Sequence, residues 1–510
     1  MIHTTSMARW KTLTVGLLLL LPWAVSCYSP ATPDEGVGSF KVEFLGDVKL
    51  GDAKTPLPVA TPNRPLTLQM KVTAIKDDGQ TDTGFNGQIC MFSDRGILVR
   101  SQTPSPIKNG VSENITARVF LAFGRTTLWV TGVPANMTCP NAADPQDNGV
   151  PPVGRVGSAP TMTFNLLSIR NVQESLDSPY DSLLFKKYAV IGAGKMVVTA
   201  VSSNGFYATD LDAYKDNKGF DSLFIFTFSA PTIAFGSEDV IPRTLSIGDI
   251  VTRVEGGVDE FSGHTQLTFP TFQPAWKEKV GGDIQQVAEA DRPKPRQFSL
   301  SDTWSRGKME KYESSVVEVK DAIALPIIES QSGWSQFRQW PILLVEPEQG
   351  KNQTKESCEN WVRTELHLQQ DASKNGGEYR TCLAGCDKQR ADKNCSPDDA
   401  ECLKVANDLF FSCFFQCRFN RQRTGLLDRI RTFGCSYTIL MVISNATVPA
   451  YDPTLPGHAN RRFPYIRGIL QQVRASAFYQ TLENQYDSEM SNNGYVIWVR
   501  QPSDLGIPTD

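Results

Sequence analysis

Two pairs of cysteines with the same four-residue spacing constrain this chain more than any other feature of its sequence. Cys382 and Cys386 form one pair, and Cys413 and Cys417 form the other. Residues four apart on an α-helix lie on the same face, so each pair places two sulfur atoms on one stripe of a helix. Two antiparallel helices with such stripes can be joined by the disulfides Cys382–Cys417 and Cys386–Cys413. The spacing therefore predicts a disulfide-stapled helical hairpin.

The other cysteines fit the same interpretation. The chain has 11 cysteines, and ten remain when Cys27 is set aside. An even number of cysteines in an exported chain is typical of disulfides. Hairpin geometry then pairs Cys395 with Cys402 beside the turn and Cys358 with Cys435 at the open end. A structural zinc site is the alternative for closely spaced cysteines, but an oxidising compartment favours bridges, and the Cys-x-x-Cys motif of redox proteins does not occur.

The beginning of the chain is typical of an export signal, expected over residues 1–26. Arg9 and Lys11 precede an apolar run that is shorter than the roughly 18 residues a membrane-spanning helix needs. The end of this run, AVSC, resembles a bacterial lipobox. The resemblance implies that Cys27 carries a lipid, that residues 27–38 form a tether, and that Tyr28 directs the protein to the outer membrane. An ordinary cleavage site, with Cys27 incidental, is the alternative.

Strand-like alternation dominates outside the Cys-rich region, which predicts a mainly β protein with about three domains. The short alternating runs between Phe40 and Leu166 fit a β-sandwich. The stretches DTGFNGQICMFSDRG (82–96) and VFLAFGRTTLWVTG (119–132) resemble bacterial immunoglobulin-like repeats. The resemblance implies an immunoglobulin-like β-sandwich over residues 39–167, in which Cys90 and Cys139 form a disulfide.

Three stretches between residues 196 and 270 resemble the OB-like domain that accompanies large secreted bacterial nucleases. In that family a strand carrying NGFY meets a hairpin of the GD-V-V-G-V-EF-G-TQL kind. The resemblance implies a first OB-like β-barrel over residues 185–300. The matching residues are Asn204, Gly205, Phe206, Tyr207, Gly248, Asp249, Val251, Val254, Gly256, Val258, Glu260, Phe261, Gly263, Thr265, Gln266 and Leu267.

The same pattern recurs near the end of the chain. MEKYESSVVEVKDAIAL (309–325) resembles the opening of a second such unit, and FPYIRGILQQVRAS (463–476) with GYVIWVRQPSDL (494–505) resembles its close. Arg500, Pro502 and Asp504 keep the composition of the family's closing strand in an altered order. The resemblance implies a second OB-like barrel over residues 308–510, with the Cys-rich hairpin inserted at 350–435, where a long loop is best tolerated.

OB-like folds bind oligonucleotides or oligosaccharides on one face of the barrel. Phe206, Tyr207 and His264 are therefore the candidate ligand-binding residues of the first barrel. Strand alternation implies that Phe206 or Tyr207 points into the core. A lone histidine such as His264 is more often a packing residue than an acid–base group.

The acidic loop DLDAYKDNKGFD is a candidate calcium site, because hard cations prefer several carboxylate oxygens on a flexible loop. Its carboxylates are Asp210, Asp212, Asp216 and Asp221. The loop lacks EF-hand spacing, and a solvated connection between two strands is the alternative.

The sequence offers no constellation for catalysis, so we expect neither an enzyme nor a cofactor. It has four histidines and no G-x-S-x-G motif, and the catalytic domain of the secreted nucleases has no room in the chain. The 51 basic residues are fewer than the 55 acidic ones, which argues against a globally nucleic-acid-binding surface. We expect a non-enzymatic lipoprotein, lipid-anchored at the outer membrane or cell surface, that binds or scaffolds an envelope protein.

A nucleic-acid-binding accessory role, related to that of the secreted nucleases, is the alternative function. Arginines near the second closing strands, including Arg461, Arg462, Arg467 and Arg474, could meet phosphates. Such residues more often solvate strands. A glycan ligand is the third hypothesis.

Overall fold

The computed structural model is mainly β and describes about two thirds of the 510 residues. The described ranges are 38–99, 104–133, 139, 155–173, 182–233, 242–261, 263–278, 282–303, 306–324, 338–361, 433–444, 461–474 and 493–508, with single positions between 385 and 406 and at 451, 452 and 458. The predicted signal peptide and Cys27 lie outside these ranges. So do Cys382, Cys386, Cys413 and Cys417, and with them the stapled part of the predicted hairpin.

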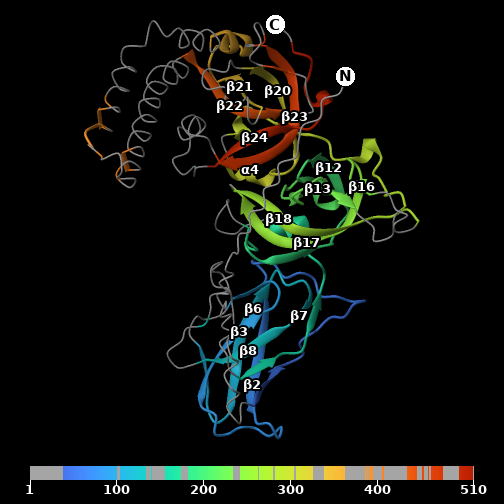
Figure 1. Ribbon diagram of the computed structural model, residues 1–510, viewed down its shortest axis with the longest axis vertical. Coiled ribbons are helices and arrows are strands. Elements are labelled where there is room, and N and C mark those ends of the chain that lie inside the picture. Colours follow the sequence, from blue (N-terminus) through green and yellow to red (C-terminus); the bar gives the residue numbers. More distant parts are fainter. Residues whose placement is uncertain are drawn as a thin grey trace, which may run out of the picture.

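Figure 1 shows three β-rich parts that follow one another along the long axis of the molecule. The first part is built on an eight-stranded sheet of order β4-β6-β2-β1-β9-β8-β3-β5, with a separate pair β10-β7. Alternate residues of its long strands are buried, for example Leu68, Met70 and Val72, because one face of the sheet covers a core. The strands are β1 (Ser39–Phe44), β2 (Leu66–Ile75), β3 (Gly87–Ser93), β4 (Ile97–Val99), β5 (Ser105–Ile107), β6 (Val111–Phe120), β7 (Gly124–Thr126), β8 (Leu128–Val133), β9 (Val156–Ser158) and β10 (Met162–Phe164).

The middle part is a sheet that closes on itself. Its order is β11-β17-β12-β13-β14-β18, and an additional β17–β18 pairing joins the ends, so that β12, β13, β14, β18 and β17 form a ring. β14 and β18 run parallel, and every other neighbouring pair in the ring is antiparallel. The elements are α1 (Ile169–Gln173), β11 (Tyr188–Ile191), β12 (Met196–Ser202), β13 (Gly205–Asp210), α2 (Leu211–Lys215), β14 (Ser222–Phe226), β15 (Thr232–Ile233), β16 (Arg243–Thr244), β17 (Ile250–Phe261), β18 (His264–Pro274) and η1 (Glu289–Asp291).

The last part repeats this arrangement. Its order is β19-β20-β21-β22-β24-β23, an additional β20–β23 pairing closes the ring, and β22 and β24 form the parallel pair. The two closed sheets, called here the first and second barrels, therefore share one strand order. The elements are β19 (Arg296–Phe298), α3 (Leu300–Thr303), α4 (Arg306–Lys311), β20 (Val316–Ala324), β21 (Gln339–Pro347), β22 (Cys435–Ser444), β23 (Arg462–Arg474), β24 (Asn493–Val499) and η3 (Pro502–Asp504).

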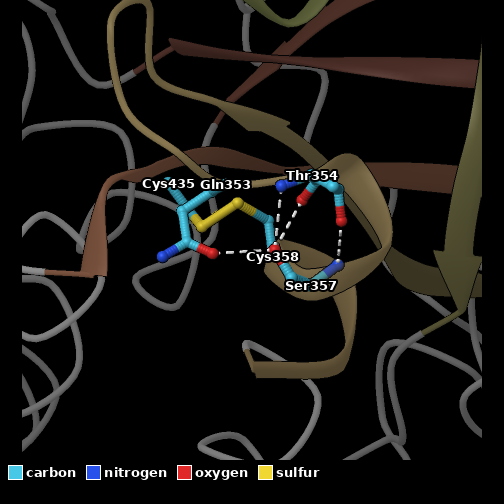
Figure 2. Close-up of a disulfide and its surroundings, with 5 residues drawn as sticks. All are labelled: Gln353, Thr354, Ser357, Cys358 and Cys435. Atoms are coloured by element: carbon cyan, nitrogen blue, oxygen red, sulfur yellow. Dashed lines mark hydrogen bonds between the residues drawn. A yellow bond between two sulfur atoms is a disulfide. The ribbon is translucent and has the colours of Figure 1, made fainter.

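The predicted insertion at 350–435 leaves and re-enters the second barrel between two paired strands. Pro347 at the end of β21 lies opposite Cys435 at the start of β22. Cys435 forms a disulfide with Cys358, with Cα atoms 5.7 Å apart. Thr354 starts the short helical stretch 355–361, because its hydroxyl accepts a hydrogen bond from the Ser357 amide (Figure 2). The ladder and the disulfide together hold the two ends of the insertion against the barrel.

Two more of the predicted disulfides occur in the described residues. Cys90 and Cys139 are joined across 49 positions, and Cys395 and Cys402 across 7. Cys90 lies on β3 of the eight-stranded sheet, and Cys90 and Cys139 are buried together with Val133. Within the described part of the chain, no helix is long and apolar enough to cross a membrane.

Candidate functional site

The two barrels meet through a cluster of buried apolar side chains. Tyr207 and Phe224 come from β13 and β14 of the first barrel, and Val316, Ile469 and Trp498 come from β20, β23 and β24 of the second. Arg500 follows β24 and donates a hydrogen bond of 3.0 Å to the carbonyl of Thr199 on β12. These contacts fix the second barrel against one face of the first.

A groove of about 780 Å³ opens beside this contact and is lined by both barrels. The first barrel contributes the β12–β13 turn, the outer face of β13 and β14, and the ends of the β17–β18 hairpin. The second barrel contributes side chains from β22, β23 and β24. The lining residues are Ser202, Ser203, Asn204, Tyr207, Phe224, Phe226, Phe228, Asp259, Phe261, His264, Gln266, Thr268, Phe269, Ile443, Gln471, Gln472 and Trp498.

A row of aromatic rings runs along the groove from its base to its rim. The ring of Phe224 lies 4.6 Å from that of Tyr207 and 6.2 Å from that of Phe226, and Phe226 lies 4.3 Å from Phe228. Phe228 in turn lies 4.8 Å from Phe269. Phe224 and Phe226 share one face of β14 because alternate residues of a strand point the same way, and Phe228 follows two residues after the end of that strand.

Exposure increases along this row. Phe224 is buried at 6% exposure, Phe226 is half-buried, and Phe228 and Phe269 are 55% and 80% exposed. Phe261 at the end of β17 is also exposed, at 69%. Isolated apolar side chains on a surface need no explanation, but three exposed phenylalanines around one groove form a patch, and such patches mark binding sites.

The base of the groove is neutral and tightly packed. The Tyr207 hydroxyl accepts a hydrogen bond from the Gln471 amide, and burial raises its pKa far above the usual range. The His264 ring lies 5.5 Å from Phe224 in a stacked arrangement and is 2.9 Å from the Ser314 hydroxyl. Burial lowers the pKa of His264 to about 3, so the ring is uncharged at neutral pH. Neither side chain is suited to proton transfer near pH 7.

The polar part of the lining consists of hydroxyl, amide and carboxylate groups. Asp259 and Gln266 lie opposite each other on the β17–β18 ladder. At the β12–β13 turn, the Ser202 hydroxyl donates a hydrogen bond of 2.8 Å to the Asn204 side chain. The described lining contains no lysine or arginine, and Asp259 is its single acidic residue.

The three candidate residues from the sequence lie in different environments. Phe206 is fully buried in the core of the first barrel, where its ring meets Phe272, and this position is not accessible to a ligand. Tyr207 points to the opposite face, as alternation predicts, but the second barrel covers it to 2% exposure. His264 lines the groove from beneath at 7% exposure. Two of the three candidates, Tyr207 and His264, therefore lie at the base of the groove, and Phe206 does not line it.

The aromatic lining residues that the sequence did not name as candidates are Phe226, Phe228, Phe261 and Phe269, which are half-buried or exposed, and Phe224 and Trp498, which are buried. A signal for part of this set exists, because the stretch LFIFTF places three phenylalanines at alternate positions. Phe261 lay within the matched hairpin, but nothing local distinguishes Trp498 from a core residue.

The four carboxylates of the acidic loop do not converge on one point. The Asp210 side chain caps α2 by accepting hydrogen bonds from the amides of Asp212 and Ala213. Asp216 forms a bidentate ion pair with Arg170, which lowers its pKa. Among the described residues, no group of three or more His, Cys, Asp or Glu side chains is placed to hold a metal ion.

Asp221 has a structural partner in the contact between the barrels. It is fully buried and forms an ion pair with Arg296, whose side chain is 8% exposed. The Ser315 hydroxyl, just before β20, donates a further hydrogen bond of 3.3 Å to Asp221. Asp221 therefore links the acidic loop to the segment that enters the second barrel.

Comparisons with known proteins give no match for this chain. No protein-family model matches the chain, and neither a curated protein nor a solved structure matches it.

Proposed function

We propose that this protein is a non-enzymatic lipoprotein of the bacterial envelope that binds its ligand in the groove between the two barrels. The observation that carries the proposal is the row of aromatic rings from Tyr207 to Phe269, which becomes exposed within a concave site. Ligand sites are concave, largely apolar and lined by a few polar groups, and this groove combines all three properties.

The finer fold assignment belongs to the same proposal. We assign OB-like folds to the two barrels and an immunoglobulin-like sandwich to the first part, with the Cys-rich hairpin inserted in the second barrel. The shared strand order, with its single parallel pair, supports the OB-like assignment. OB-like folds bind ligands on strands 2 and 3 and on the loops between strands 1 and 2 and between strands 4 and 5. In the first barrel these elements are β13, β14, the β12–β13 turn and the β17–β18 turn, which line the groove.

The location in the envelope rests on the signal and on Cys27. A lipid on Cys27 would hold the protein at the outer membrane or cell surface, followed by the tether at 27–38. Disulfides at Cys90–Cys139 and Cys358–Cys435 are consistent with export, because such bonds persist outside the reducing cytoplasm. In this role the protein would recognise a component of the envelope.

The test compares the mature full chain with the double variant Phe228→Ala/Phe269→Ala on purified envelope fractions. We expect co-sedimentation of the protein with one fraction, and at least a tenfold weaker retention of the variant. The matched control is Val99→Ala/Ile507→Ala, which removes two exposed apolar side chains that do not line the groove. Equal retention of all three proteins would show that the groove is not the binding site.

The nucleic-acid accessory role remains the alternative, because exposed aromatic rings also stack on bases. The ion pairs of the described arginines near the closing strands argue against this alternative. Arg462 forms ion pairs with Asp321 and Glu359, and Arg467 with Glu318, so these cations already have carboxylate partners. Binding of single-stranded DNA that weakens steeply with salt would favour this alternative.

A further inference from the structure

We infer that the groove takes an uncharged oligosaccharide. This inference rests on the proposed function, since it names the ligand class of the same site. Three features of the lining carry it: the absence of cations among its described residues, the exposed aromatic faces, and polar groups that match hydroxyls.

The charge of the lining argues against an anionic chain. Nucleic acids and other polyphosphates depend on lysine and arginine for most of their affinity. The described lining residues include neither, and the carboxylate of Asp259 would repel a phosphate. His264 adds no positive charge, because it lies buried against Phe224 and accepts no proton at neutral pH. The lining therefore argues against an anionic chain and is compatible with a neutral ligand.

The aromatic row suits the C–H faces of sugar rings. A π-face carries partial negative charge, and the C–H groups on one side of a pyranose carry partial positive charge, so the two surfaces attract each other. Phe226, Phe228 and Phe269 lie with neighbouring ring centroids 4.3 and 4.8 Å apart. Their planes are tilted by 54° and 43°, so the row offers a curved aromatic surface, and the groove volume of about 780 Å³ leaves room for more than one sugar.

The polar groups of the groove match hydroxyls. A carboxylate such as Asp259 accepts two hydrogen bonds at once, as from two neighbouring hydroxyls of one sugar. The amides of Asn204 and Gln266 and the hydroxyl of Ser202 each combine donor and acceptor capacity. A sugar hydroxyl likewise does both, whereas an acyl chain does neither.

The closed sheet argues against a peptide bound as an added strand. Such binding needs an unpaired strand edge. In the first barrel β14 is paired with β13 on one side and with β18 on the other, and β17 closes the ring. The groove therefore presents side chains from the sheet face, which is how sugars are recognised.

The experiment is isothermal titration of the mature full chain with defined probes. The neutral probes are the β-1,4-linked glucose hexamer, the β-1,4-linked N-acetylglucosamine hexamer and the α-1,4-linked glucose hexamer. The charged probe is (dT)12, and phosphatidylethanolamine vesicles test insertion into lipid. We expect at least one hexasaccharide to bind, with an affinity that changes less than about twofold between 50 and 500 mM NaCl, since no counterions are released.

Substitutions of groove residues test whether the saccharide binds in the groove. Phe228→Ala and Phe269→Ala should each weaken saccharide binding about tenfold, the size of a lost stacking contact. Asp259→Asn should weaken saccharide binding several-fold and leave the melting temperature unchanged, because it replaces one carboxylate acceptor by an uncharged amide of the same size. Val99→Ala should leave the affinity unchanged, since Val99 is exposed away from the groove.

Two results would overturn the inference. One is that no hexasaccharide binds, and the other is that binding does not depend on Phe228 and Phe269. If (dT)12 or vesicles bind instead and the phenylalanine variants weaken them, the groove remains a binding site for a different ligand class. The proposed function itself fails only if the envelope-retention test also shows no difference between the wild type and Phe228→Ala/Phe269→Ala.

Discussion

Phe228 and Phe269 hold their rings 4.8 Å apart although both residues have a left-handed backbone, with φ of 62° and 49°. The left-handed region costs a residue with a side chain about 1–2 kcal/mol. Both side chains are exposed, so burial does not offset this cost. Strained residues of this kind cluster at functional sites, and the pair lies at the rim of the groove where a ligand would enter.

Replacing these residues by glycine should separate stability from binding. In Phe228→Gly and Phe269→Gly, relief of the backbone strain stabilises the folded protein. The loss of the ring contact and the greater freedom of the unfolded chain act against this gain. The free energy of unfolding should therefore change by less than about 1 kcal/mol in each variant. Ligand binding should still weaken about tenfold. The control Phe261→Gly places glycine in a strand and should cost about 1 kcal/mol. Urea unfolding measures the free energy of unfolding of all three variants. A loss above about 2 kcal/mol in both Phe228→Gly and Phe269→Gly would identify a structural role for the two phenylalanines instead.

The folded protein should lose stability in mild acid because of His264. Burial lowers the pKa of His264 to about 3 in the folded protein, whereas the ordinary value is 6.5. The unfolded chain therefore binds a proton that the folded chain does not, and stability falls as the pH drops from 6.5 towards 3. The slope from this group is about 1.4 kcal/mol per pH unit. His264→Gln keeps a partner for Ser314 and should show a flatter decline in melting temperature between pH 6.5 and 4. Parallel curves for the two proteins would contradict this assignment.

Glu313 should act in the opposite direction. Burial, with further contributions from Glu310 and Glu260, raises the pKa of this carboxyl well above its ordinary value of 4.5. The folded chain then binds a proton that the unfolded chain releases, so the contribution of Glu313 to stability is greatest below pH 4.5 and falls as the pH rises. Glu313→Gln removes this penalty while keeping an oxygen to accept the hydrogen bond of 3.0 Å from the Thr265 amide.

We expect Glu313→Gln to match the wild type near pH 4 and to have a higher free energy of unfolding than the wild type at pH 7. Chemical unfolding at both pH values measures the difference. Glu289→Gln is the control, because Glu289 is exposed in η1. A variant that is less stable than the wild type at pH 7 would show that Glu313 is ionised and satisfied in the folded protein.

The disulfide between Cys358 and Cys435 should contribute more stability than the one between Cys395 and Cys402. A cross-link restricts the unfolded chain, and the restriction grows with loop length. The first bond spans 77 positions and the second 7. Replacing both cysteines by alanine should cost about 4 kcal/mol for the long loop and about 2 kcal/mol for the short one. Thermal unfolding of the two double variants tests this order, and equal losses would contradict it.

Local pattern and cysteine positions determined a large share of the architecture. Alternation along strands such as Leu66–Ile75 indicated a mainly β protein, because a strand repeats every two residues whatever its partners are. The cysteine pattern predicted the pairs Cys358–Cys435 and Cys395–Cys402, and the immunoglobulin-like resemblance implied Cys90–Cys139; the structure contains all three. The phenylalanines at 224 and 226 also share a face of β14 by periodicity alone.

Only the tertiary structure decided which of these faces are accessible. Alternation separates Phe206 from Tyr207, but the burial of Tyr207 depends on Gln471 and Trp498, which lie more than 260 positions later in the chain. The groove likewise exists because a second barrel with the same strand order packs beside the first. Side-chain periodicity is set by the bonds of neighbouring residues, whereas a concave site requires distant segments to pack together, and that packing depends on the whole chain.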